Sequence, residues 1–215
     1  MYLPKFFEEK NHERIIDLIR EYPFATLISV HSGEPCINHL PLIFENLPSG
    51  KIKLVGHMAR SNPQADLLPE SGEVTVVFHG PNSYISPSWY SSRDGVPTWN
   101  YATVHLRGKI AWIKEFAPLV SVLKKMTAKF EGESENSWKF SLPENLSNEK
   151  SITQAIIGFE IKVETVQAKF KLSQNRSSED REGVLKGLQQ KTDEISQQVL
   201  RLIRDVSSGD EWNKE

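Results

Sequence analysis

The strongest constraint on the fold is a series of strand-like segments that are not separated by regularly spaced helices. Short runs rich in β-branched and aromatic residues recur along the chain between turn residues. They cover residues 24–30, 36–44, 52–57, 74–78, 101–113 and 157–170. A doubly wound sheet would need a helix after nearly every strand. The pattern therefore predicts a mostly β protein, an antiparallel barrel with helices at its periphery.

Apolar residues at helical spacing predict the peripheral helices. The first helix is expected at residues 11–21, where Asn11 can act as N-cap and Pro23 follows the end. The polar stretch 132–148 is expected to form a loop. Longer helices are expected at residues 115–130, 178–189 and 193–206.

Composition limits the partners and the compartment. Lys and Arg number 26 against 28 Asp and Glu, which gives a net charge of −2. A protein that holds duplex DNA by itself usually presents a basic face, so DNA binding is allowed here but gets no support from the charge. The apolar runs are too short to span a bilayer, and the N-terminus lacks a secretory signal pattern. With Cys36 as its single cysteine, the chain is expected to be cytoplasmic, without membrane contact.

The segment around Pro63 contains the first candidate binding site. Pro63 is expected to open a short helix with Ser61 or Asn62 as its N-cap. The free backbone amides at such a helix start could bind a phosphate, with Arg60 and His57 adding donors or charge. A capped helix beside a surface arginine is the alternative, and the residues alone leave both open.

Large aromatic residues gather in a following segment whose Pro, Ser and Asn content is typical of a loop. They are Trp89, Tyr90, Trp99 and Tyr101. Large aromatic side chains are usually buried in the core and are seldom found in loops. Their presence in this segment therefore predicts a pocket wall for a planar ring or a subunit interface. A hydrophobic lid packed on the barrel is an equal alternative. The histidines match no compact metal-ligand spacing, so no metal site is expected.

A third polar group precedes the helix expected at residues 178–189. Lys171, Gln174, Asn175 and Arg176 are clustered there and could present donors to a phosphate or to a neighbouring subunit's ligand. A solvated, charged turn is the alternative interpretation of the same residues.

Several segments, taken in order, resemble the PaiB-type family. They are MYLPKFFEE, YPFATLIS, NHLPLIF, GHMARSNPQ, VFHGPNSYISPSWY, VPTWNYATVHLRG, GFEI and KLSQNRSSEDREGV. The resemblance implies a mostly β fold with peripheral helices, the FMN-binding split β-barrel, which is an antiparallel Greek-key-type barrel. It also implies FMN as cofactor, and a homodimer that holds it at the subunit interface. We therefore expect a barrel domain at residues 1–188 and a C-terminal helical extension at 189–215.

The resemblance also implies which positions hold the cofactor. The flavin ring edge is expected at the backbone of an early strand, and the phosphate at the segment around Arg60. The partner subunit is expected to contribute residues from two later segments. In order, the expected cofactor-binding residues are Asn38, His39, Leu40, His57, Met58, Arg60, Ser61, Asn62, Trp99, Asn100, Lys171, Gln174 and Arg176.

The function implied by the resemblance is regulation of sporulation and degradative-enzyme genes, through or alongside a bound flavin. The alternative is an FMN-dependent oxidoreductase with a small-molecule substrate, in which the cofactor carries the chemistry. No residue is singled out as a catalytic acid or base, and a helix-turn-helix pattern is not evident. Haem binding is a third class, for which no axial ligand can be chosen.

Overall fold

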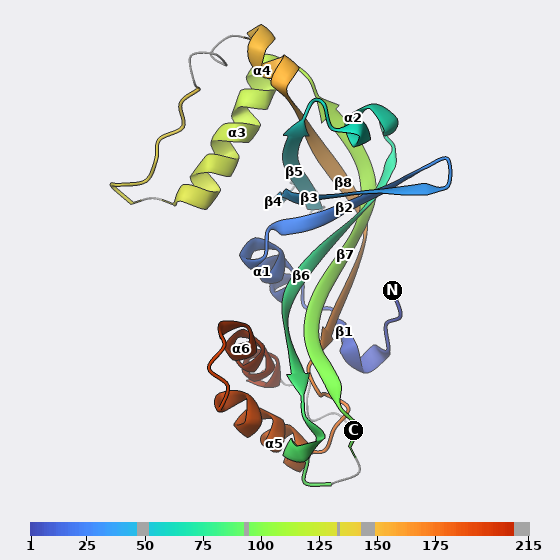
Figure 1. The fold of residues 1–215 in the computed structure, drawn as a ribbon, viewed down its shortest axis with the longest axis vertical. Coiled ribbons are helices and arrows are strands. Elements are labelled where there is room, and N and C mark those ends of the chain that lie inside the picture. Colours follow the sequence, from blue (N-terminus) through green and yellow to red (C-terminus); the bar gives the residue numbers. More distant parts are fainter. Residues whose placement is uncertain (47–51, 93–94, 133, 143–148, 209–215) are drawn as a thin grey trace. The chain divides into compact units, whose positions relative to one another are not determined.

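The computed structural model of the 215-residue chain describes residues 1–46, 52–92, 95–132, 134–142 and 149–208 (Figure 1). Its strands are β1 (Glu8–Glu9), β2 (Phe24–His31), β3 (Glu34–Pro41), β4 (Ile43–Asn46), β5 (Ile52–Ala59), β6 (Glu73–Ile85), β7 (Thr98–Ile113) and β8 (Ile156–Lys171). Its α-helices are α1 (His12–Glu21), α2 (Pro63–Leu67), α3 (Phe116–Glu131), α4 (Glu149–Ala155), α5 (Ser178–Gln189) and α6 (Glu194–Ser208). Short 3₁₀ turns cover Lys5–Phe7 and Pro87–Trp89.

The eight strands form one sheet in the order β3-β2-β6-β7-β8-β5-β4, and β1 pairs with β8. Every pairing with a defined register is antiparallel: β1 with β8, β2 with β3 and β6, and β5 with β4 and β8. The prediction of a mostly antiparallel β fold with peripheral helices is therefore confirmed.

The chain separates into two compact units. Unit 1 comprises Met1–Leu18, His79–Val104 and Gln167–Glu215, and unit 2 comprises Ile19–Phe78 and His105–Val166. The long strands β6, β7 and β8 contribute residues to both units. The expected boundary between a barrel at 1–188 and an extension at 189–215 stays a prediction.

Unit 2 has a curved sheet whose two ends approach each other. β3 stands at one end of the strand order, yet Asn38 on β3 is hydrogen-bonded to Asn62, three residues after β5 ends. Gly56 of β5 packs so closely against Leu42 and the Phe159 ring that a Cβ atom there would collide with Leu42. The interior of this curved sheet is filled by the alternating apolar residues of its strands, as a half-buried antiparallel sheet requires.

The helix α3 packs against β5 within unit 2. Val122 and Met126 are buried on α3 and contact Val55 of β5, with Ile43 of β4 in the same cluster. The apolar spacing of residues 115–130 predicts a buried stripe of Leu119, Val122, Leu123, Met126 and Phe130. Leu119, Val122 and Met126 are buried, whereas Phe130 is exposed, so the helix is held by the first part of this stripe.

In unit 1, α5 and α6 lie against each other (Figure 1). Gly183 and Gly187 of α5 face Trp89, and a Cβ atom at either glycine would overlap that residue. Ser196 of α6 is hydrogen-bonded to Ser83 of β6 at 2.9 Å between two buried hydroxyls. Glycine therefore permits the close approach of α5, and the serine pair ties α6 to the strand.

Most predicted elements are present, with three differences. The strand expected at 36–44 is interrupted at Leu42, so that it becomes β3 and β4. The strand expected at 74–78 continues to Ile85 through Gly80 and Pro81, a pair that is typical of a strand end. Part of the loop expected at 132–148 is described and has no regular structure, but α4 follows it unpredicted. Pro48, Ser49 and Gly50 also predict a turn, and these residues lie outside the part of the chain that the structure describes.

Candidate functional site

A buried network of amide side chains lies beside β3 in unit 2. Gln64, fully buried at the start of α2, donates from Nε2 to the Ser29 hydroxyl at 2.9 Å and to the Cys36 carbonyl at 3.2 Å. Its Oε1 accepts from the Asn38 amide at 2.8 Å. The Asn62 amide donates to the Asn38 Oδ1 at 3.0 Å. These bonds satisfy the buried amides and fix the segment after β5 to the strand β3.

The amides at the start of α2 are already hydrogen-bonded. The Asn62 Oδ1 accepts from the Gln64 N–H at 3.0 Å, and the Asn62 carbonyl accepts from the Ala65 N–H at 2.9 Å. The two amides that were expected to be free therefore have partners within the chain, as in the alternative of a capped short helix, while phosphate binding by the neighbouring residues stays a prediction.

Arg60 is the charged residue between the end of β5 and the capped helix α2. Its backbone N–H donates to the Ala155 carbonyl at 2.9 Å, which fixes the main chain where β5 ends. Its guanidinium is half-buried and has no hydrogen-bond or ion-pair partner among the residues that the structure describes. Ser61 beside it is exposed. A half-buried guanidinium with all its donors available is suited to bind an anion.

β3 is the last strand of the described sheet on its side, because only β2 pairs with it. A strand with one neighbour leaves a row of backbone N–H and C=O groups without sheet partners. Asn38 and Leu40 are half-buried on one face of this strand, whereas His39 is exposed on the other. The His39 ring stacks on Phe24 and its Nδ1 lies 3.1 Å from the Thr26 hydroxyl.

His57 and Met58 do not join the amide network. The His57 Nδ1 lies 3.3 Å from the Met126 sulfur of α3, and burial lowers the pKa of His57 below 6.5. A neutral imidazole is therefore favoured at this position. The next residue, Met58, points to the opposite face of β5 and is buried in the core.

The predicted residues of unit 1 form a separate group. Asn100 is fully buried; its Nδ2 donates to the Ser173 hydroxyl at 2.9 Å, and that hydroxyl donates back to its Oδ1 at 3.2 Å. The Lys171 ammonium donates to the Thr98 hydroxyl. Trp99 is exposed and meets the Tyr84 ring edge-on.

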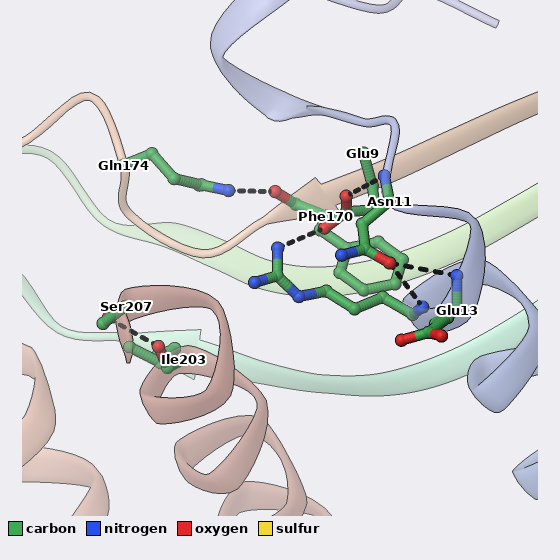
Figure 2. Close-up of polar contacts among 8 residues, drawn as sticks. Glu9, Asn11, Glu13, Phe170, Gln174, Ile203 and Ser207 are labelled. Carbon is green, nitrogen blue, oxygen red and sulfur yellow. Dashed lines mark hydrogen bonds and ion pairs between the residues drawn. The ribbon is translucent and has the colours of Figure 1, made fainter. Parts of the chain in front are cut away.

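Gln174 is turned back onto its own segment. Its Nε2 donates to the Phe170 carbonyl (Figure 2). Its Oε1 accepts from the Leu172 N–H. Gln174 and Phe170 line a pocket of about 550 Å³ together with Glu9, whose carboxylate accepts from the Asn11 N–H at 2.6 Å (Figure 2). The pocket belongs to unit 1 alone, as all its lining residues do.

The aromatic segment divides into buried and exposed members. Trp89 is half-buried against α5, and Tyr90 is buried beneath the Arg176 guanidinium, which lies 4.5 Å from its ring centroid. Trp99 is the member that stays exposed. Trp89 and Tyr90 are therefore packed as a hydrophobic lid would be, whereas Trp99 presents an exposed aromatic surface.

Lys169 was not predicted as a site residue, although the structure buries it among aromatic rings near Lys171. A lysine in the alternating pattern 166–171 gives no sign of burial by itself. The groups around the Lys169 ammonium come from Tyr2, Phe7 and Tyr101, which are far from it in the sequence. Within the described residues, no group of His, Cys, Asp and Glu could hold a metal ion.

The fold is a mostly antiparallel sheet with peripheral helices, and comparison with known families identifies the class of protein to which it belongs. The family described as "Putative FMN-binding domain" matches residues 1–165, and the chain belongs to that family. The resemblance to the PaiB-type family and FMN as cofactor are thereby confirmed. The chain is similar to "Protease synthase and sporulation protein PAI 2" of Bacillus subtilis (strain 168), with 39% identity over 207 residues, 95% of this chain and 97% of the relative.

Two solved flavoproteins have a similar fold. The FAD and heme binding protein from Mycobacterium smegmatis has a TM-score of 0.58 at 19% identity, over 76% of this chain and 73% of its own. The flavocytochrome Anf3 from Azotobacter vinelandii has a TM-score of 0.58 at 13% identity, over 79% and 72%. At such identities the likeness shows the fold, the split β-barrel, and nothing about ligands. No helix of the described residues is long and apolar enough to cross a membrane.

Proposed function

We propose that this protein binds FMN in unit 2, between the free edge of β3 and the turn that follows β5. The observation that carries the proposal is the Arg60 guanidinium, which lacks a polar partner among the described residues. It is two residues from Asn62, and the hydrogen bond between Asn62 and Asn38 ties this turn to β3. A charged donor and an unpaired strand edge are thus held close together, as a phosphate joined to a planar ring requires.

Each part of this site has a separate task. Arg60 and Ser61 hold the phosphate, Arg60 by charge-assisted hydrogen bonds. The backbone of Asn38, His39 and Leu40 meets the polar edge of the flavin ring. When bound, FMN supplies one- or two-electron redox chemistry, and the protein positions it and sets its electrostatic surroundings.

The remaining residues of unit 2 expected at the cofactor act by holding these groups in place. Asn62 caps α2 and binds Asn38, so it fixes both the turn and the strand. Met58 anchors β5 in the core, and the neutral His57 packs that strand against α3. A site supported by packed, fully hydrogen-bonded residues keeps its geometry when the ligand binds.

A homodimer is part of the proposal, because the outer face of β2 and β3 is apolar and exposed. Phe24, Val30 and Ile37 are 64%, 66% and 53% exposed on these two strands. A second copy of the chain that covers this face would bury them beside the β3 edge. Of the residues of unit 1 expected at the cofactor, Trp99 is the most exposed, and it is the one that a partner subunit would bring to the flavin.

We assign the biological role to control of protease synthesis and sporulation through the flavin, on the 39% identity to the Bacillus subtilis protein. Direct operator binding is disfavoured by the net charge of −2. A regulator of this kind would change its partner or its oligomeric state between oxidised and reduced FMN. Gel filtration of both states tests this; identical elution and identical partners in both states would leave a plain FMN oxidoreductase as the better account.

The Arg60 assignment is tested by comparing FMN with riboflavin, which lacks the phosphate. A charge-assisted hydrogen bond contributes about 1.5–3 kcal/mol, so Arg60→Ala should weaken FMN binding roughly ten- to a hundredfold. Riboflavin binding should stay unchanged. Arg107→Ala is the matched control, since Arg107 is an exposed arginine of β7 in the same unit. An equal loss for both flavins, or no loss of FMN affinity, would remove Arg60 from the phosphate site.

A further inference from the structure

A second basic group lies in unit 1, and it consists of Lys169, Lys171 and Arg176. We name it the unit 1 basic cluster. None of the three forms an ion pair with a carboxylate in the part of the chain that the structure describes. Elsewhere in this unit basic side chains do have such partners, as Arg14 does with Glu9 at 3.3 Å.

Lys169 is the innermost member, with only 8% of its surface exposed. Its ammonium donates to the Tyr2 carbonyl at 3.1 Å and lies 5.4 to 5.9 Å from the ring centroids of Tyr2, Phe7 and Tyr101. Aromatic faces stabilise a buried cation but leave its charge uncompensated. Lys169 therefore adds a net positive potential to its surroundings.

Lys171 lies two residues further along β8, on the same face of the strand as Lys169. Both ammonium groups stand over the Phe7 ring, at 5.9 and 6.0 Å from its centroid. Burial lowers the pKa of Lys171; the nearby Tyr101 opposes this, and the positive charges of Lys169 and Arg176 add to it. Like charges held this close destabilise one another unless a bound anion compensates them.

The third member, Arg176, packs on the ring of Tyr90, a buried residue with an unsatisfied hydroxyl. Its guanidinium covers the Tyr90 ring, and Tyr90 is 4% exposed. The Tyr90 hydroxyl is the one buried side-chain polar atom without a hydrogen-bond partner in the described residues. A buried hydroxyl normally has a partner, so the described residues leave the hydrogen-bonding capacity of this one unused.

Hydrogen bonds within the chain fix the backbone that carries the cluster. Ser173 has a positive φ of 68°, and its hydroxyl is locked to Asn100 by two hydrogen bonds. Gln174 closes the turn through Phe170 and Leu172. Lys171 and Arg176 lie on either side of this turn, so neither depends on a freely moving loop for its position.

We propose that the unit 1 basic cluster binds the phosphate or carboxylate group of an anionic small molecule other than FMN. Lys171 and Arg176 contact the anion, and Lys169 strengthens the site by its buried charge. The proposal goes beyond the flavin site and rests on it in one respect, since Arg60 is taken to hold the FMN phosphate. It assigns an anionic molecule as the second ligand of the protein.

The test uses the full chain saturated with FMN and titrated with inorganic pyrophosphate in a calorimeter, at an ionic strength kept constant with chloride. Lys171→Met keeps most of the apolar stem and removes the charge; it should weaken pyrophosphate binding at least tenfold. Arg176→Gln should do the same. Lys186→Met, at an exposed lysine of α5 in the same unit, should change the affinity less than twofold.

The proposal would be overturned by a wild-type protein that does not bind pyrophosphate, and equally by a Lys186→Met protein that loses as much affinity as Lys171→Met. A third arm separates it from the flavin assignment by measuring FMN and riboflavin affinities in Lys171→Met. The ratio of the two affinities should equal that of the wild type. A fall of the ratio toward one would mean that the cluster holds the FMN phosphate, and the second ligand would be rejected. Failure of Arg60→Ala alone would leave the pyrophosphate result standing.

Discussion

Asn100 of β7 and Ser173, two residues after β8, exchange two hydrogen bonds at 2.9 and 3.2 Å while both are buried. Ser173 adopts a positive φ, a conformation that serine seldom takes. The side-chain pair therefore holds a strained turn in place, and that turn carries Lys171 and Arg176. Both polar groups of the Asn100 side chain are thus bonded within its own chain, and its assignment to the cofactor stays a prediction.

Ser173→Ala should destabilise the protein by about 1–3 kcal/mol, because the buried Asn100 amide would lose both partners. Urea unfolding followed by circular dichroism measures the effect. Ser121→Ala, at an exposed serine of α3, is the control and should stay within about 0.5 kcal/mol of the wild type. A Ser173→Ala protein as stable as the control would mean that the Asn100 pair does not hold the turn.

Asp180, buried at the start of α5, should make stability depend on acid. Its carboxylate accepts four hydrogen bonds of 2.9 to 3.1 Å from the backbone and hydroxyl groups of Ser91 and Ser92. Burial raises the pKa of Asp180, but the bonds from Ser92 and Ser91 outweigh it and keep the pKa below 3.8. The stabilisation is therefore fully present above pH 3.8 and is lost as the pH falls through the lowered pKa.

Asp180→Asn removes this dependence, since the amide cannot accept the same four bonds. The variant should be less stable than the wild type at pH 7, and the difference should shrink as the pH is lowered below 3.8. Thermal unfolding of both proteins between pH 7 and pH 3 measures this. A difference that is constant over the whole range would contradict the assigned role of the carboxylate.

Gly187→Ala should destabilise α5 although alanine favours helices by roughly 1 kcal/mol over glycine. The added methyl group would overlap the Trp89 ring, which typically costs about 1–3 kcal/mol in a packed site. The loss should be smaller in a Trp89→Leu background, and unfolding free energies of the four proteins in this cycle test the contact. Equal losses in both backgrounds would place the strain elsewhere.

Tyr90→Phe removes the unpaired buried hydroxyl and should raise the stability of the ligand-free protein by up to about 1 kcal/mol. Tyr101→Phe is the comparison, because Tyr101 is half-buried and its ring faces Lys169. Thermal unfolding measures both. A clear loss of stability in Tyr90→Phe would show that the hydroxyl has a partner, and it would weaken the case for a ligand at the unit 1 basic cluster.

Local chemistry explains which elements the sequence could predict. Asn62 followed by Pro63 is a strong helix-start signal, and the structure has that cap. Asn11 caps α1 in the same way, with its Oδ1 accepting from the Glu13 N–H at 3.0 Å (Figure 2). The helix α5 begins and ends where the pattern of residues 178–189 places it.

Contacts between distant segments explain what could not be predicted. Asn38 and Gln64 meet because the sheet curls, and no local pattern records that meeting. The burial of Lys169 depends on Tyr2 and Phe7 at the other end of the chain. The extension of β6 through Gly80 and Pro81 follows from sheet pairing, which overrides the local preference of both residues for a turn.

The central claim, that this chain is a flavoprotein, is tested most directly by the visible absorption spectrum after incubation with excess FMN and desalting. The protein should emerge yellow and retain about one FMN per chain, with the band shape shifted from that of free FMN by the site. The same treatment with Arg60→Ala should leave much less flavin bound. A wild-type protein that emerges colourless, with all FMN in the small-molecule fraction, would contradict the account.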